Sequence, residues 1–173
     1  MTSNPQAPDD DRPPLDTAAA MALAVRYQTF VTLSGGDRPS RLASDAHVEA
    51  FLEVSDRVRV DPDPLGLLDA LVVLARDADD GGAFAGAVGA GPVEDVLTGR
   101  PELWPALAER CRASDAWADT VRGAWVDPDL AASMPAGLGD LVIRPSGEND
   151  VPGEPVTRRR PARDRRARRV RRR

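Results

Sequence analysis

Residues that stop helices recur at short intervals along this chain, and their spacing constrains the fold more than any other feature. Glycine frees the backbone to turn, and proline disfavours helical geometry in the residue before it. Such breaks stand at Gly35-Gly36, Asp61–Pro64, Gly81-Gly82 and Asp127-Pro128. Between them apolar residues recur at helical spacing, and no convincing period-two alternation marks a strand. The chain is therefore expected to fold as short helices joined by tight turns.

The pattern predicts an all-α domain at residues 15–131, built as a small bundle or short helical-repeat-like array of about six helices. The helices are expected to begin at Leu15, after Ser44 as an N-cap, at Pro64, Pro92 and Pro101, and after Ser114. Residues 1–14, with four prolines and an acidic cluster, are expected to be disordered. Residues 132–173 are likewise expected to be disordered, and they end in an Arg-rich tail at 158–173.

Charge is distributed very unevenly along the sequence. All 23 basic residues are arginine, which suggests a GC-rich genome, and the net charge of -5 conceals a tail of about +10 on a body of about -15. Such a tail favours salt-dependent binding to nucleic acid or an anionic membrane, although it has no aromatic residues for base stacking. Two other interpretations of the tail are open. It associates loosely with the acidic body, or it is low-complexity coding at the end of a gene. The tail arginines are Arg158, Arg159, Arg160, Arg163, Arg165, Arg166, Arg168, Arg169, Arg171, Arg172 and Arg173.

Composition excludes several classes of protein. The single cysteine, Cys111, rules out an intramolecular disulfide framework and cannot form a zinc site alone. The acidic start of the chain is unlike the basic start of a signal peptide. Its apolar runs fall short of the ~20 residues that cross a bilayer. We therefore expect no membrane span and a cytoplasmic location.

Two sequence blocks carry a family resemblance. The first is Gly89–Leu97, which reads GAGPVEDVL, and the second is Trp117–Trp125, which reads WADTVRGAW. Together they resemble a domain-of-unknown-function family of short bacterial helical proteins, with a Gly-Pro-aliphatic-Glu-Asp-aliphatic-Leu block followed by a Gly-x-Trp. The resemblance covers about residues 63–126 and implies a helical fold with no assigned activity. The family places basic residues where Ala118 and Asp119 stand here. The residue expected to neutralise Glu94 or Asp95 in their place is Arg122, on the same predicted helix.

These blocks supply the candidate site, which comprises Gly91, Pro92, Glu94, Asp95 and Trp125. Adjacent carboxylates on a helix point about 100° apart, so Glu94 and Asp95 do not form an obvious acid/base pair. Acids in a first helical turn usually complement the positive end of the helix. The alternatives for these two are a buried ion pair, a partner contact, or catalysis in a helical cleft.

Other chemically suggestive residues are expected to be structural. The glycines at 86, 89 and 91 lack the preceding strand that a dinucleotide loop needs. The small residues Gly82, Ala85, Gly86 and Gly89 more simply allow close helix approach and a sharp turn. His47 has no partner of a catalytic triad in sequence, and Cys111 is expected in the core. Asp77, Asp79 and Asp80 lack the ligand spacing of a calcium loop.

With no catalytic constellation, metal set or cofactor motif, the sequence favours a non-enzymatic protein–protein interaction module. Its acidic helical surface would contact an unidentified protein partner. The alternatives are a nucleic-acid-associated protein that uses the arginine tail, an immunity or antitoxin-like neutraliser of a basic toxin, and an enzyme that uses Glu94 or Asp95.

Overall fold

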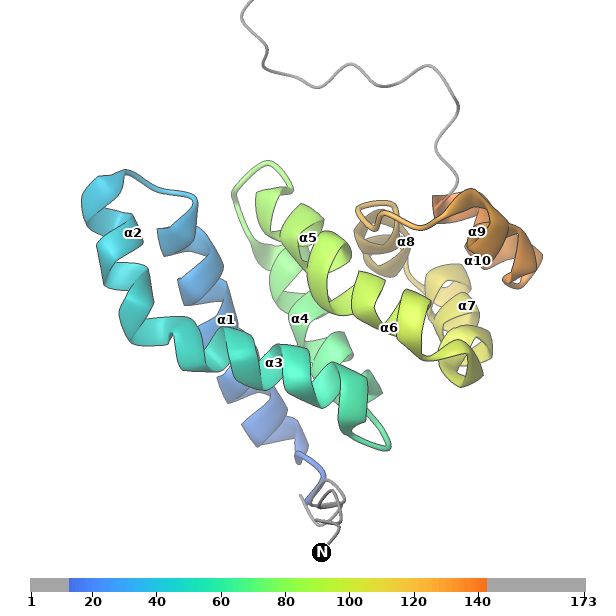
Figure 1. Cartoon of the computed structure of the whole chain (residues 1–173), viewed down its shortest axis with the longest axis horizontal. Coiled ribbons are helices and arrows are strands. Elements are labelled where there is room, and N and C mark those ends of the chain that lie inside the picture. Colours follow the sequence, from blue (N-terminus) through green and yellow to red (C-terminus); the bar gives the residue numbers. More distant parts are fainter. Residues whose placement is uncertain (1–12, 143–173) are drawn as a thin grey trace, which may run out of the picture. The chain divides into compact units, whose positions relative to one another are not determined.

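The computed structural model describes residues 13–142, and every regular element within them is helical (Figure 1). The expectation of an all-α fold is confirmed. Residues 1–12 and the arginine tail at 158–173 lie outside the described residues, so the interpretation of both ends as disordered stays a prediction there.

The α-helices of the described part follow one another with short connections. They are α1 (Thr17–Ser34), α2 (Arg38–Ser44), α3 (Val48–Val60), α4 (Leu65–Asp77), α5 (Ala83–Val88), α6 (Glu94–Gly99), α7 (Trp104–Ala113), α8 (Asp115–Val121), α9 (Pro128–Ser133) and α10 (Ala136–Val142). The 3₁₀ turns η1 (Asp45–His47) and η3 (Pro101–Leu103) precede α3 and α7, and the π-helical turn η2 (Gly89–Val93) joins α5 to α6.

Side-chain caps and glycines set several of these boundaries. The Asp16 carboxylate accepts a hydrogen bond from the Ala19 N–H at 2.7 Å, so α1 begins just after Leu15. Ser114 caps α8 as predicted, accepting from the Trp117 N–H. Gly82, at φ +87°, takes the left-handed conformation that starts α5, which favours glycine at this position.

The predicted N-cap role of Ser44 is wrong. Pro39 stands in the first turn of α2, where its missing N–H costs nothing. Asp37 caps that helix by accepting from the Ser40 N–H at 3.0 Å. Ser44 is the last residue of α2, and its buried hydroxyl donates to the Arg41 carbonyl.

The expectation of disorder from residue 132 is also wrong for residues 132–142. Asp127-Pro128 does not simply stop a helix: the Asp127 carboxylate accepts from the Asp129 N–H at 2.9 Å and begins α9. Helix α10 then buries Leu138 and Val142 against the rest of the domain. The glycines flanking Leu138 hid its helical pattern, although Gly139 allows α10 to approach the Ala131 carbonyl closely.

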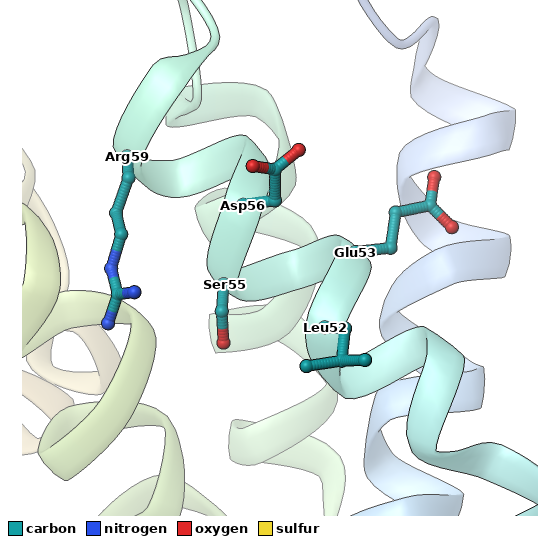
Figure 2. Close-up of a pocket in the computed structure, with 5 residues that line it drawn as sticks. All are labelled: Leu52, Glu53, Ser55, Asp56 and Arg59. Carbon is teal, nitrogen blue, oxygen red and sulfur yellow. The ribbon is translucent and has the colours of Figure 1, made fainter.

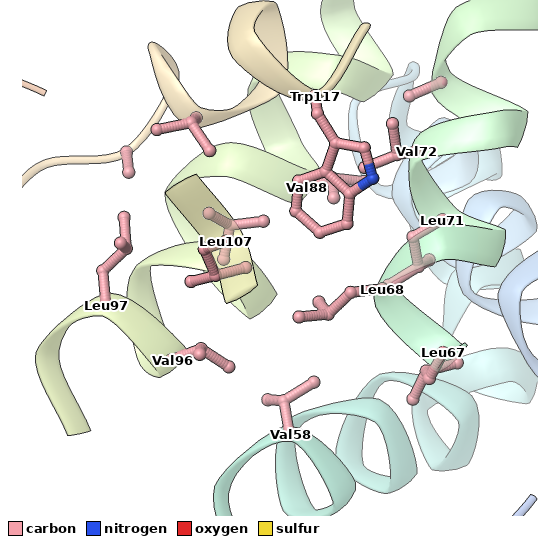
Figure 3. Packing of buried hydrophobic residues seen from close by; sticks show 14 of the residues in the cluster. Val58, Leu67, Leu68, Leu71, Val72, Val88, Val96, Leu97, Leu107 and Trp117 are labelled. Carbon is pink, nitrogen blue, oxygen red and sulfur yellow. The ribbon is translucent and has the colours of Figure 1, made fainter. Parts of the chain in front are cut away.

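The core is centred on α4, whose dense apolar run in the sequence predicts the most buried helix of the domain. Leu67, Leu68, Leu71 and Val72 are buried, and α4 packs on α1, α5 and α8. Figure 3 shows these side chains converging with Trp117 and Leu107 from the later helices. Tyr27, on the same buried face of α1 as Leu23 and Ala24, contacts the rings of Phe51 and Phe84, with centroids 6.2 and 6.1 Å away.

Candidate interaction site

The first motif block, Gly89–Leu97, was expected to turn the chain sharply at its glycines, but the helical path continues through it. Helices α5 and α6 are joined without interruption by the π-helical turn η2, which spans Gly89–Val93 and contains Pro92. Proline has no N–H to donate to the residue four positions earlier, and a π-turn is a local adjustment that accommodates this loss. Pro92 and Val93 are buried, so the turn positions α6 and its two acids against the core.

The two motif blocks meet in space at their glycines. A Cβ built on Gly89 would lie 2.3 Å from the Thr120 carbonyl oxygen and 2.8 Å from the Cα of Gly123. A Cβ built on Gly123 would also lie close to the Cα of Gly86. The backbone of η2 therefore contacts the end of α8 directly, a contact that side chains would prevent. This confirms the predicted role in close helix approach for Gly89, whereas a Cβ at Gly82 or Gly86 would meet no atom within 4 Å.

Glu94 and Asp95 diverge toward different parts of the fold. Oε2 of Glu94 accepts a hydrogen bond from the Trp125 N–H at 2.8 Å and fixes the loop between α8 and α9. Oδ1 of Asp95 forms an ion pair with Arg59 of α3 at 2.8 Å. Arg122 forms an ion pair with Asp119, and its expected role in neutralising Glu94 or Asp95 stays a prediction. The Arg59 side chain is mostly exposed, so its ion pair with Asp95 contributes only ~0.2–1 kcal/mol.

Gly91 completes the packing of this motif. A Cβ at Gly91 would lie 3.3 Å from the hydroxyl of Tyr27, which is buried beneath η2. Burial, and to a lesser degree the negative charge of Asp95, raise the pKa of Tyr27 to about 12. Gly91 and Asp95 thus hold η2 and α6 against α1 and α3, and Glu94 holds the α8–α9 loop against α6.

Trp125 lies outside the helix that precedes it. The four-residue spacing of Trp117, Val121 and Trp125 is typical of a single helical stripe, but α8 ends at Val121. Trp117 and Val121 are buried, whereas Trp125 stands in the following loop with 62% of its surface exposed. Trp125 is therefore a surface residue of the motif and not part of the core.

Sequence reasoning missed the outer face of α2 and α3. Helical spacing places Val48, Phe51, Leu52, Val54 and Val58 on one broad face, but only Val54 and Val58 are buried. The buried side of α3 is completed by Ala50 and Arg57 instead. Leu42 of α2 and Leu52 of α3 are 65% and 58% exposed. The signal was present in the sequence, because α3 carries more apolar residues than one buried stripe can hold.

Acidic residues accompany these exposed apolar side chains. They stand at spacings of three and four residues, which places them on one side of the helical run, and they are Asp45, Glu49, Glu53 and Asp56. A depression of about 510 Å³ lies on this surface, lined by Leu52, Glu53, Ser55, Asp56 and Arg59 (Figure 2). All five come from α3, so the depression is an open feature of one helix rather than a cleft between elements. We call this surface, from Leu42 to Arg59, the α3 outer face.

A half-buried polar cluster also escaped prediction. Asp69 interrupts the apolar run of α4, and its carboxylate accepts two hydrogen bonds from Arg110 and one from Nε1 of Trp117, each at 3.0 Å. The same hydrogen bonds raise the pKa of Arg110. These contacts tie α4 to α7 and α8. An acid in the middle of an otherwise apolar stripe was the sequence signal for this cluster.

Of the remaining chemical candidates, His47 lies in η1, within the stretch that forms the α3 outer face, and Cys111 lies in α7. Burial raises the pKa of Cys111 to about 11, which leaves little reactive thiolate at neutral pH. Over residues 13–142 no group of three or more His, Cys, Asp or Glu side chains is arranged to hold a metal ion. None of the helices in that range combines the length and apolar character that crossing a bilayer requires.

Comparison with protein-family models, curated proteins and solved structures finds no match to this chain. The family resemblance of the two motif blocks stays a prediction.

Proposed function

We propose that this chain is a non-enzymatic protein–protein interaction module that binds its partner through the α3 outer face. The observation that carries the proposal is a row of exposed apolar side chains, Leu42, Val48, Phe51 and Leu52, beside a row of acids on the same helical run. Protein interfaces commonly combine apolar anchors at their centre with a polar rim that excludes water. A bacterial, cytoplasmic setting is part of the same proposal.

The packing of Phe51 supports a preformed surface. Its ring contacts Phe30 and Tyr27 of α1, with centroids 5.1 and 6.2 Å away, while more than a third of the residue remains exposed. Glu53 is held by Arg26 of α1 and by Arg57, each at 3.2 Å. A surface whose side chains are already ordered loses less entropy on binding.

The engagement of the two motif acids argues against the enzyme alternative. Glu94 and Asp95 each contact a neighbouring element, as described above, and they point away from one another. We therefore assign the motif a supporting role: it fixes α6, and through Arg59 it braces the C-terminal turn of α3. An immunity or antitoxin-like role remains compatible with the proposed function, since it would be one form of protein binding.

A photo-crosslinking amino acid at position 52 tests the proposal, with the same residue at exposed Ala132 of α9 as the matched control. The expected result, in a lysate of the source organism, is a discrete crosslinked species from position 52 alone. Val48→Asp in the same chain should suppress it without changing the circular dichroism spectrum. Equal products from both positions, or none from position 52, would contradict the proposal.

The arginine tail supports a second candidate function, association with nucleic acid. Its eleven arginines among 16 residues favour retention on DNA or RNA that falls steeply with salt. Replacing these arginines by glutamine should abolish that retention, and unchanged retention would exclude the tail as its cause.

A further inference from the structure

We infer that the partner segment recognised by the α3 outer face is a basic amphipathic helix lying along α3. The inference rests on the proposed function and names the chemistry of the partner. It is drawn from the arrangement of charge and apolar surface on α3 and from the secondary structure around it.

Acidic and apolar side chains form two parallel rows on this face. Glu49, Glu53 and Asp56 follow one another by four and three residues, and so lie on one side of α3. Val48 and Leu52 form the adjacent row with the same four-residue period. From Asp45 to Asp56 the acidic row extends over about 16 Å at 1.5 Å per residue, or three helical turns. A partner that pairs with both rows must carry a cationic and an apolar row side by side over the same length.

A helix can carry two such rows side by side, whereas an extended strand would gain no main-chain hydrogen bonds from this surface. The described part of the chain has no sheet edge, so an extended peptide would find no backbone ladder to join. A helix satisfies its own backbone hydrogen bonds and presents residues three and four apart on one face. Its apolar residues would contact Val48 and Leu52, while its arginines or lysines would face Glu49 and Asp56.

Charge selects against the other classes of occupant. Residues 13–142 contain 21 acids and ten arginines, a net charge of -11. A second copy that presented the same face would bring like charges together, since a twofold interface pairs a surface with itself. Nucleic acid and anionic membranes would be repelled from the acidic row for the same reason. A cationic protein segment is the occupant that the surface charge attracts.

Synthetic peptides of 18 residues test the inference with the full chain. The probe carries leucines at positions three and four apart and lysines on the flank. A peptide of the same composition in scrambled order, without an amphipathic face, and a variant with glutamate for lysine are the comparisons. Affinity is measured by fluorescence anisotropy of the labelled peptides, and backbone amide shifts locate the binding site. We expect the probe to bind about tenfold more tightly than the scrambled peptide and the glutamate variant to show no binding.

Charge-reversed variants locate the contact on this surface. Glu49→Lys with Asp56→Lys should weaken probe binding about tenfold. The control, Asp79→Lys with Asp115→Lys, makes the same change in net charge at exposed acids elsewhere and should leave the affinity within twofold. Circular dichroism and the urea midpoint establish that both variants are folded.

Two outcomes overturn the inference while leaving the proposed function intact. One is equal affinity of the probe and the scrambled peptide, which would mean attraction by charge alone. The other is equal weakening by both charge-reversed variants. If position 52 crosslinks to a partner segment that is neither basic nor helical, the inference also fails and the interaction module stands. Failure of the crosslinking itself refutes the proposed function separately.

Discussion

Two glycines of one continuous helical segment are expected to respond to the same substitution in opposite directions. A Cβ at Gly86 would meet no atom within 4 Å, whereas a Cβ at Gly89 would lie 2.3 Å from the Thr120 carbonyl oxygen and 2.8 Å from the Cα of Gly123. In both cases alanine removes the backbone entropy cost of glycine in a helix, a gain of roughly 0.5–1 kcal/mol. Only at Gly89 must two stretches of backbone move apart.

The cost of that movement sets the size of the effect. Overpacking costs about 1–3 kcal/mol, and the upper end applies because the atoms contacted belong to backbone. After subtraction of the helix gain, Gly89→Ala should lower the free energy of unfolding by about 2 kcal/mol. For a domain of about 130 residues, each kcal/mol shifts Tm by about 3–5 °C. The expected Tm is therefore about 6–10 °C lower for Gly89→Ala and about 2–4 °C higher for Gly86→Ala.

Thermal and urea denaturation of the two variants and the wild type, followed by circular dichroism, give both quantities. The urea midpoint should change while the m-value stays constant, because the same surface is exposed on unfolding. A Gly89→Ala protein as stable as wild type would refute the direct contact between η2 and the end of α8. An equal loss from Gly86→Ala would refute the argument that the difference arises from contact geometry.

The remaining predictions concern the contacts around this packing. Glu94→Ala should lower the free energy of unfolding by about 1 kcal/mol, because it removes the acceptor of the Trp125 N–H, and Glu94→Gln should recover most of that loss in a urea titration. Asp69→Ala should cost about 2–3 kcal/mol and shift the fluorescence of Trp117, since three hydrogen bonds end on this carboxylate; an unchanged emission spectrum would contradict the assignment. Tyr27 is the sole tyrosine, so its ionisation can be followed at 295 nm, with a midpoint near pH 12 in the folded protein and near 10 in urea. Because folding raises this pKa, the stability that the protonated hydroxyl provides is complete below pH 10 and is lost as the pH rises toward 12; Tyr27→Phe should remove this loss.

The sequence identified the pieces of the motif but not how they connect. Gly91, Pro92, Glu94 and Trp125 were recognisable by type and spacing, and the role of glycine in close helix approach followed from its missing side chain. Which acid contacts which element depends on how α6 lies between α3 and the α8–α9 loop. Residues 36 and 31 positions apart form those contacts, and local patterns carry no information on such pairs.

Surface and core on α3 could not be separated from the sequence for a related reason. Val48, Leu52 and Val54 have similar apolar character, yet the first two lie on the outer face and the third is fully buried. The buried side includes Arg57, whose charge is compensated there because Asp61 accepts its hydrogen bond at 2.8 Å. A sequence pattern that counts every arginine as exposed therefore assigns the wrong side of α3 to the core.

The sequence by itself determined the helical class, the central position of α4, and an acidic body without a recognisable catalytic set. These follow from periodicity, from turn residues and from charge, which act between near neighbours in the chain. Only the tertiary structure decided that Trp125 stands exposed, that residues 132–142 are helical and packed, and that α3 presents a mixed acidic and apolar face. Each depends on which surfaces other helices cover, and that is settled by the packing of the whole domain.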